Sequence, residues 1–525
     1  MTPIRPATLD DLRRRRWEVL ALTSVGAFMN PLLGAITSVA LPAVSKDLGL
    51  SFSAAMWVQA VYLLAMAVLL IPLGRLADER GRMRYYLVGI AVFTASSLVC
   101  AFSPNGAWLI AGRGVQGVGA AWLGATSVAI VTDAFPPKER GRALGINVAT
   151  VYLGLSIGPP LGGFLTDTLG WQAVFLFVVP IGLVVLVWGW RLLPHDERPD
   201  RLEPERRDAG MIDRAAGRAR QARPDIIGAA LWGAFLICLL VPLTFAPQWG
   251  WVGTRSVVLL VAAVLFLLAF VAVERRAADP LLDLDLLVGN RLFAAANAAA
   301  LLNYMALYAI SMLTAVFLQV VQHRSAALTG WIMLSQPLIQ ALLAPVAGRL
   351  SDRVGSRVLA TTGMVATAVG MVLLGSLSAG AGLPRMVASL AVVGFGMAAF
   401  SAPNTSAVMG SVARGQLSLA GAFLATMRST GMALSVAVLG GIAASQLGEA
   451  GGRLIFGRGG GAEGAVYGVR VAADFARGYS YAMYVGAAFA VVGALASLTR
   501  GQHSAGVGQR PPAPTAAPDA GPAGS

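Results

Sequence analysis

Residues 348–357 read Gly-Arg-Leu-Ser-Asp-Arg-Val-Gly-Ser-Arg, and residues 74–83 read Gly-Arg-Leu-Ala-Asp-Glu-Arg-Gly-Arg-Met. The two stretches nearly repeat each other, and each follows a long apolar segment. A repeat at this separation in a chain of 525 residues predicts two halves with the same layout. In a membrane chain, such duplication favours transport by alternating access.

The composition indicates a membrane protein. Hydrophobic residues make up 56% of the chain and charged residues only 13%, and the mean hydropathy is +0.69. A helix of about 20 apolar residues crosses a hydrocarbon core about 30 Å thick and satisfies its own backbone hydrogen bonds. Fourteen segments fit this description, over residues 17–40, 53–74, 85–103, 107–132, 143–163, 172–190, 225–246, 256–273, 293–320, 329–348, 358–378, 385–408, 418–445 and 479–499.

These segments predict an all-α integral membrane protein built as two six-helix bundles with an inserted helix pair. The expected units are a segment over 1–16, a bundle over 17–190, an Arg-rich linker over 191–224, an inserted pair over 225–273, a connector over 274–292, a second bundle over 293–499 and a disordered tail over 500–525. The glycine-rich loop over 446–478 is open to two interpretations, an ordered hairpin or lid and a flexible connector.

Charge placement predicts the orientation. Most of the 40 Lys and Arg residues fall in loops on the side of the N terminus, so both termini are expected in the cytoplasm and the chain in the cytoplasmic membrane. The basic residues are scattered among short loops, which argues against nucleic-acid binding. Cys100 and Cys238 lie in separate apolar segments, so we expect no disulfide, metal site or cofactor.

Arg113 is predicted to lie inside an apolar segment, where a charge normally faces a cavity or a partner. Gln116 follows three residues later and shares its helix face. We expect the pair to act in substrate binding or coupling, and a hydrogen-bond clamp onto backbone carbonyls is the alternative. Arg428 is the approximate counterpart in the second half, with a larger chance of serving only packing.

Polar and aromatic side chains in the apolar segments predict the lining of a cavity. They are Asn30, Gln59, Tyr62, Gln116, Asn147 and Tyr152 in the first half, and Asn303, Tyr304, Tyr308, Gln336, Gln340 and Asn404 in the second. Aromatic faces with amides and few charges suit a loosely specified amphiphilic ligand. For about half of these residues, the alternative is an interhelical hydrogen bond.

The repeated stretch itself predicts a gate. We expect Asp78 to accept backbone N–H groups at a helix start, while the arginines around it stay cytoplasmic and latch one access state. The alternative is that these arginines only enforce topology. The residues of this prediction are Gly74, Asp78, Arg80, Gly81, Arg82 and Arg84, with Asp352 as a weaker counterpart beside Arg353 and Arg357.

Small residues in the fifth segment predict close helix contact. Gly154, Gly158, Gly162 and Gly163 recur at spacings that let a neighbouring backbone approach, and Pro159 is expected to add a bend. Two interpretations of this helix have equal weight. In one it is a pivot that seals the outer gate, and in the other its small residues serve only helix packing.

Taken together, these motifs resemble the major facilitator superfamily, specifically its fourteen-span drug/proton antiporter group. The resemblance covers nearly the whole chain and includes the stretch Trp171 to Gly182. It implies export of drug-like molecules by proton antiport, with Arg113 in substrate or proton coupling. The group typically carries an aspartate seven residues before the alanine of an Ala-Leu-Pro ending. Here that ending is Ala40 to Pro42, and the corresponding position is Leu33.

No predicted segment holds Asp or Glu at its centre, and the three histidines lie in loops or the tail. Asp133, at the end of the segment that carries Arg113, is the best remaining proton carrier, and a helix-end anchor is the more favoured interpretation of it. Without a counter-charge, the arginines favour neutral or anionic ligands over lipophilic cations.

The sequence therefore predicts a transporter that exports amphiphilic or drug-like small molecules, with membrane lipids and possible protons as further partners. One alternative is an exporter or facilitator of a lipid or an anionic secondary metabolite without proton coupling. A non-transporting membrane receptor is the alternative from another class. No nucleophile motif or nucleotide-binding loop is present, so an enzyme is not expected.

Overall fold

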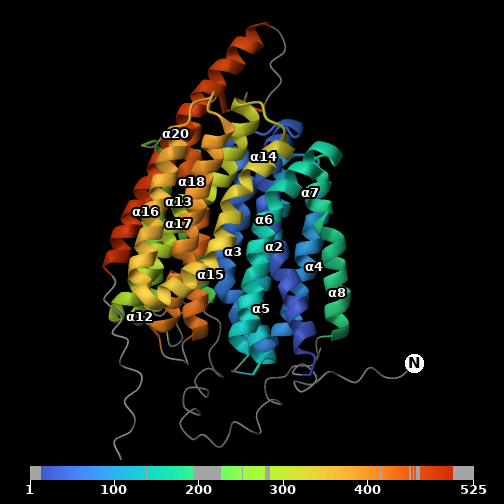
Figure 1. Cartoon of the computed structure of the whole chain (residues 1–525), viewed down its shortest axis with the longest axis vertical. Coiled ribbons are helices and arrows are strands. Elements are labelled where there is room, and N and C mark those ends of the chain that lie inside the picture. The colour runs from blue at the N-terminus through green and yellow to red at the C-terminus, as the bar shows by residue number, and fades with distance from the viewer. Residues whose placement is uncertain are drawn as a thin grey trace, which may run out of the picture.

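The computed structural model of the chain describes residues 14–136, 139–192, 226–250, 252–277, 284–412, 417–448, 451–452, 455–456 and 462–499. Within this part, 14 helices are long and apolar enough to span a membrane, and no strand occurs. The helices stand side by side as one upright bundle (Figure 1). The predicted all-α membrane fold with an inserted helix pair is confirmed.

The two halves have the same helix order. The first half comprises α2 (Arg16–Asp47), α3 (Phe52–Arg80), α4 (Arg82–Ala101), α5 (Gly106–Ala134), α6 (Arg140–Leu169), α7 (Gln172–Leu176) and α8 (Val178–Leu192). The inserted pair is α10 (Ile226–Trp249) and α11 (Thr254–Glu274), followed by α12 (Leu284–Gly289). The second half comprises α13 (Arg291–Val316), the π-helical η2 (Phe317–Val321), α14 (Ala326–Met333), α15 (Ser335–Val354), α16 (Ser356–Gly375), α17 (Leu383–Gly410), α18 (Leu417–Ser445) and α20 (Ala462–Leu498).

Helix packing repeats between the halves. In the first half α2 packs on α6, α3 on α5 and α4 on α5, and in the second half α13 packs on α18, α15 on α17 and α16 on α17.

The two ends of the bundle are named by the chain termini. Because α2 begins and α20 ends at the same end of the bundle, we call this end the termini face. The opposite end, where α7 and α14 lie in Figure 1, is the far face.

The repeated stretch is a helix end followed by a sharp turn, and most of it is helical where a loop was expected. Gly74 to Arg80 form the last turns of α3, and Arg82 starts α4. Gly81 between them has φ 109°, and Gly355 at the same place in the second copy has φ 87°. These values favour glycine, which has no Cβ to clash with the backbone. Both copies therefore join two spans by a single glycine.

Two predicted spans are each split into two helices. The span over 172–190 is interrupted at Phe177, between α7 and α8, and the span over 329–348 at Leu334, between α14 and α15. Pro180 and Pro337 follow these breaks by three residues. Proline has no N–H to continue the helical hydrogen bonds, which explains both interruptions.

The region over 446–478 differs from both interpretations of it. Residues 462–478 are the first part of α20, which in Figure 1 projects beyond the far face of the bundle, and no hairpin occurs in the described part of this region. Phe475 and Phe456 both pack against Phe52 at the start of α3, with ring centroids 5.5 and 6.3 Å away. This packing explains why the helix begins far earlier than residue 479.

Several predictions fall outside the described residues. They concern residues 1–13 of the N-terminal segment, residues 193–224 of the Arg-rich linker and the tail over 500–525. The side chain of Asp352 also lies outside them, although its backbone belongs to α15.

Candidate functional site

Arg113 of α5 is fully buried in the first half and holds α5 against α3. Its Nε donates to the carbonyl oxygen of Val58 at 3.0 Å, and its Nη2 donates to Oε1 of Gln59 at 3.2 Å. Its Nη1 donates to Oε1 of Gln116. No described carboxylate forms an ion pair with this guanidinium. The guanidinium N–H groups therefore donate to carbonyl and amide oxygens and not to a carboxylate among the described residues.

Further polar contacts extend this network to two more helices. Nε2 of Gln116 donates to Oγ of Ser97 in α4 at 2.6 Å, and Nε2 of Gln59 donates to Oγ of Ser38 in α2 at 3.2 Å. The guanidinium carbon of Arg113 lies 4.3 Å from the centroid of the Tyr62 ring. A cation over an aromatic face is attracted by the ring quadrupole. Four helices of the first half are thus joined around one buried charge.

The edge of this network reaches the boundary between the halves. The hydroxyl of Tyr62 donates to Oδ1 of Asn30, which is only half-buried. From the second half, the hydroxyl of Tyr308 lies next to Gly34 of α2, 3.6 Å from where a Cβ would stand. Asn30, Tyr62 and Tyr308 therefore bring the two halves together in the middle of the bundle.

Arg428 of α18 forms a smaller cluster in the second half. Its Nη2 donates to Oγ1 of Thr405 at 2.6 Å, and its guanidinium carbon lies 5.6 Å from the centroid of the Tyr304 ring. Across the boundary, the hydroxyl of Tyr152 in α6 lies 3.1 Å from Oγ of Ser401 in α17. Arg428, Tyr304 and Tyr152 are each half-buried. These groups remain partly accessible between the halves.

The remaining predicted lining residues are divided between burial and partial exposure. Asn147 donates to Oγ of Ser127 at 3.5 Å, and Nδ2 of Asn303 lies 3.3 Å from the sulfur of Met397. These two amides are buried, as are Gln340 and Asn404, whereas Gln336 is half-buried. The contacts of Asn147 and Asn303 lie within one half, whereas Gln340 of α15 interacts with Tyr152 of α6 across the boundary.

The halves are closed against each other at the far face. A Cβ at Gly163 of α6 would collide with the carbonyl oxygen of Ala326 in α14. A Cβ at Gly330 of α14 would collide in the same way with the carbonyl oxygen of Pro159. Nε2 of Gln319 also donates to the carbonyl oxygen of Val39 at 2.8 Å. Only glycine permits backbones to approach this closely.

A charged group adds to this closure. Oδ1 and Oδ2 of Asp167, at the end of α6, accept the backbone N–H groups of Ala326 and Ala327 at 3.2 and 2.7 Å. Oγ of Ser325 accepts the N–H of Leu328 at 3.2 Å. The N–H groups of the first helical turn have no partner within the helix, so a carboxylate from the other half is well placed there.

Contact between the halves decreases toward the termini face. Pro159 and Gly163 share one stripe of α6 with Tyr152, Ala149 and Gly145, at helical spacings of three and four residues. The stripe is in tight contact at Gly163, and at Tyr152 it contacts Ser401 and Gln340 of the second half. Around a Cβ at Gly145 there is no atom within 4 Å. The same holds for Gly348 of α15. The halves therefore diverge at the termini face.

The other predicted glycines lie against α2 in the same half. A Cβ at Gly154 would lie 2.7 Å from the carbonyl oxygen of Phe28, and one at Gly162 would lie 2.8 Å from Cα of Ile36. Gly158 meets Ala35 and Leu32 in the same way. One face of α6 thus packs on α2 while Gly163 faces the second half.

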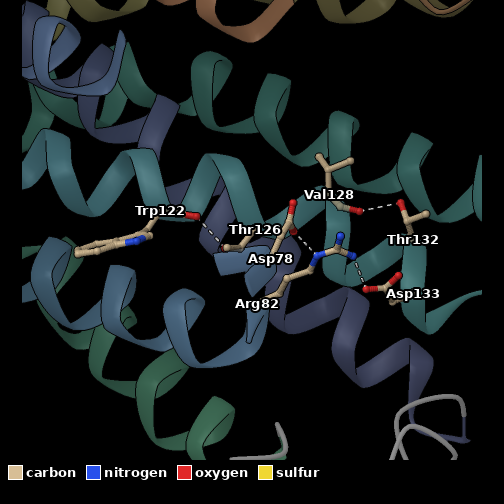
Figure 2. A network of polar contacts seen from close by, with 7 residues as sticks. All are labelled: Asp78, Arg82, Trp122, Thr126, Val128, Thr132 and Asp133. Atoms are coloured by element: carbon tan, nitrogen blue, oxygen red, sulfur yellow. Dashed lines mark hydrogen bonds and ion pairs between the residues drawn. The ribbon is translucent and has the colours of Figure 1, made fainter. Parts of the chain in front are cut away.

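At the termini face, three charged residues connect the end of α3 with the end of α5 (Figure 2). Nε of Arg82 donates to Oδ1 of Asp78 at 2.5 Å, and its Nη1 donates to Oδ2 of Asp133 at 2.6 Å. Asp78 was expected to accept backbone N–H groups at a helix start, but it lies in the last turns of α3 and its contact is to Arg82. Arg80 and Arg84 are exposed. All three members of this cluster belong to the first half.

The sequence did not single out Ser38, Ser97, Ser401 or Thr405. Serine and threonine in helices usually bond to their own backbone, so their type alone is not a signal. Asp167, at the end of the fifth apolar segment, was not singled out either. The contact of Asp167 with α14 depends on how the halves are packed.

Comparisons with known proteins agree with this fold. The profile of the Major Facilitator Superfamily matches residues 23–274 and 296–520. The riboflavin transporter RibZ of Clostridioides difficile (strain 630) is 32% identical over 424 residues, which cover 81% of this chain and 87% of that protein. The multidrug resistance protein Stp of Mycobacterium tuberculosis is 32% identical over 437 residues, which cover 83% and 77%. A crystal structure of a bacterial homologue of the human lysosomal transporter Spinster aligns with a TM-score of 0.66 and 17% identity, over 92% of this chain and 97% of that one. The chain therefore belongs to the Major Facilitator Superfamily and is a multi-pass membrane transporter of small molecules.

Proposed function

We propose that this transporter exports amphiphilic, drug-like small molecules through the cytoplasmic membrane by alternating access between its halves. One observation carries the proposal: partly accessible polar and aromatic side chains lie midway between two halves that are sealed at one end only. Tyr152, Tyr304, Tyr308 and Arg428 supply these groups. Such a seal and such a site are what alternating access requires.

The termini face is the cytoplasmic one in this proposal. Most Lys and Arg residues lie in the segments that join helices at this face. Basic residues are retained in the cytoplasm when a membrane protein inserts. The structure then corresponds to a state that faces the cytoplasm, from which an exporter loads its substrate.

The chemistry between the halves favours a neutral or anionic aromatic amphiphile. Arg428 and the Tyr304 ring beneath it supply a cation and an aromatic face. The acids at the span ends lie at the two faces of the bundle, so a lipophilic cation would meet arginine without a counter-charge. The names of RibZ and Stp associate relatives with a flavin and with several drugs, and both agree with an aromatic ligand.

The Asp78–Arg82–Asp133 cluster is proposed as the latch of the termini face. Its ion pairs fix the turn between α3 and α4 to the end of α5. Asp133 is exposed and already paired, so its proposed role is to anchor this helix end. If transport is proton-coupled, as the resemblance implies, Asp133 is the carboxylate to test first.

Substrate flux in proteoliposomes tests the proposal. Suitable probes are an anionic anilinonaphthalene sulfonate, a neutral N-alkyl dansylamide and cationic ethidium, each with and without a pH gradient. We expect transport of the neutral or anionic probe and the least transport of ethidium. Transport of ethidium alone would contradict the proposed ligand chemistry, and absence of flux for all three would contradict export of amphiphiles.

The pH gradient separates two modes of transport. Flux that requires the gradient and disappears in Asp133→Asn would assign coupling to the latch. Flux that is independent of the gradient in both proteins would identify an uncoupled carrier, as for a facilitator or exchanger. An equal loss in the matched variant Asp47→Asn, whose contact with Trp171 lies within the first half, would show that Asp133 has no special part in coupling.

A further inference from the structure

The inserted helix α10 covers one of the two seams between the halves. It lies against α3 of the first half and α18 of the second. Nε2 of Gln248 donates to Oγ of Ser53 at 3.1 Å, and the Phe245 ring stacks on Trp57 with centroids 6.0 Å apart. Toward the middle of the bundle, a Cβ at Gly233 would lie 3.0 Å from Val68. Helix α10 therefore lies along α3 from the far face of the bundle to the middle of α3.

Contact with the other half fixes α10 in this position. A Cβ at Gly441 of α18 would lie 2.6 Å from the carbonyl oxygen of Leu243 in α10. Leu236 and Leu240 of α10 are fully buried. Lipid is therefore excluded from the seam between α3 and α18 over this length.

The opposite seam, between α6 and α15, has no such cover among the described elements. It is closed at the far face by the Gly163 and Gly330 contacts, but its termini half is open at Gly145 and Gly348. On α6 this opening is flanked by the apolar side chain of Val148, which is 50% exposed, and by Ala149, which is also exposed.

The geometry points to the α6–α15 seam as a lateral portal, through which a membrane-dissolved amphiphile passes from the leaflet at the termini face to the site between the halves. Because α10 covers the α3–α18 seam, the amphiphile enters from the α6–α15 side of the bundle. Apolar side chains along an open seam let an alkyl chain stay in a hydrocarbon environment while its polar head advances toward Tyr152 and Arg428. This inference rests on the proposed function and assigns the substrate class more closely, as molecules that partition into the bilayer.

A homologous series of probes distinguishes passage from the membrane and passage from water. Each methylene adds about 0.8 kcal/mol to membrane partitioning, so the nine methylenes between an N-methyl and an N-decyl dansylamide add about 7 kcal/mol. The decyl compound therefore reaches the protein almost only through lipid. Both compounds have the same head, so both report the same alternating cycle.

Ala149→Trp places a large ring on the exposed part of the α6 stripe. In proteoliposomes that contain the full chain, we expect the transport rate of the decyl compound to fall severalfold and that of the methyl compound to stay at the wild-type value. Ala95→Trp is the matched control, because Ala95 is an exposed alanine on α4, away from both seams. Gly145→Leu, one turn earlier on the stripe, repeats the test with a smaller side chain and a better helix former.

The remaining outcomes contradict the portal. An equal fall in the transport rates of both compounds would mean that the ring at position 149 blocks the alternating-access cycle itself. It would not indicate a path through lipid. An unchanged decyl rate in both stripe variants would mean that the seam is not used. Transport of the methyl but not the decyl compound by the wild type would assign access from water, whereas transport of neither would count against the proposed export itself.

Discussion

The contact of Asp167 with α14 predicts how firmly the far face is closed. Asp167 belongs to the first half, and the N–H groups that it accepts belong to Ala326 and Ala327 of the second. The contact therefore exists only while the far face is closed. Asp167→Asn keeps an oxygen of similar shape and removes the negative charge, so it weakens the closed state without creating a cavity.

The structure gives the size of the expected effect. A hydrogen bond to a charged group contributes about 1.5–3 kcal/mol, and a charge at a helix N-terminus about 0.3–1 kcal/mol. Asp167 is exposed, so water competes with both interactions, and asparagine retains one acceptor. A net loss of about 1–2 kcal/mol remains, which changes the ratio of closed to open molecules by about 5–30-fold.

Distance measurements between spin labels on the two halves can detect this shift. Cysteines replacing Phe102, at the far end of α4, and Ser378, after α16, lie in different halves and are exposed. Cys238, which is half-buried, is first replaced by alanine, and Cys100 is buried. We expect Asp167→Asn to raise the share of long distances at the far face.

A matched control exists at the same face. Asp47 accepts the indole N–H of Trp171 at 2.8 Å, and both residues belong to the first half. Asp47→Asn should therefore leave the distances unchanged. The same shift in both variants, or no shift in Asp167→Asn, would refute the assignment of Asp167 to far-face closure.

Three further predictions follow from other contacts. Gly163→Ala should prevent far-face closure and abolish flux in proteoliposomes because its Cβ would meet the backbone of Ala326, whereas Gly145→Ala, with open space around it, should retain wild-type flux. Arg113→Ala should lower the melting temperature in detergent because the buried amide oxygens of Gln59 and Gln116 lose their donor, at a cost of about 1–3 kcal/mol each; an unchanged melting temperature would contradict the clamp. Asp78→Asn should slow the exchange between states and leave substrate affinity unchanged, as measured by flux and by equilibrium binding; a pure affinity loss would count against the latch.

Much of the fold could be predicted from apolar length and the repeated stretch. Both depend on local sequence, because a span must satisfy its own backbone wherever water is absent. The extent of α20 could not be predicted in this way. Its first part is rich in glycine and lies beyond the predicted span, and its order depends on Phe475 packing against Phe52 from the other half.

The candidate site was predictable as a set of residues but not as a set of contacts. Arg113 and Gln116 share a helix face, and that pair follows from spacing alone. The contacts of Arg113 with Gln59 and Tyr62 depend on how α5 packs on α3. Which polar residues face the boundary and which are buried within one half is likewise a property of the packed bundle.

The charged groups at the two faces differ in what they connect. Asp167 joins the halves, so its energy depends directly on whether the far face is open. The Asp78–Arg82–Asp133 cluster lies within one half, and its ion pairs are intact while the termini face is open. A contact within one half is present in both states unless its helices rearrange. The cluster can therefore bias the equilibrium only by changing the shape of the first half or by meeting a group of the second half on closure. For this reason we expect Asp167→Asn to change which state is populated, and Asp78→Asn to change mainly how fast the states exchange.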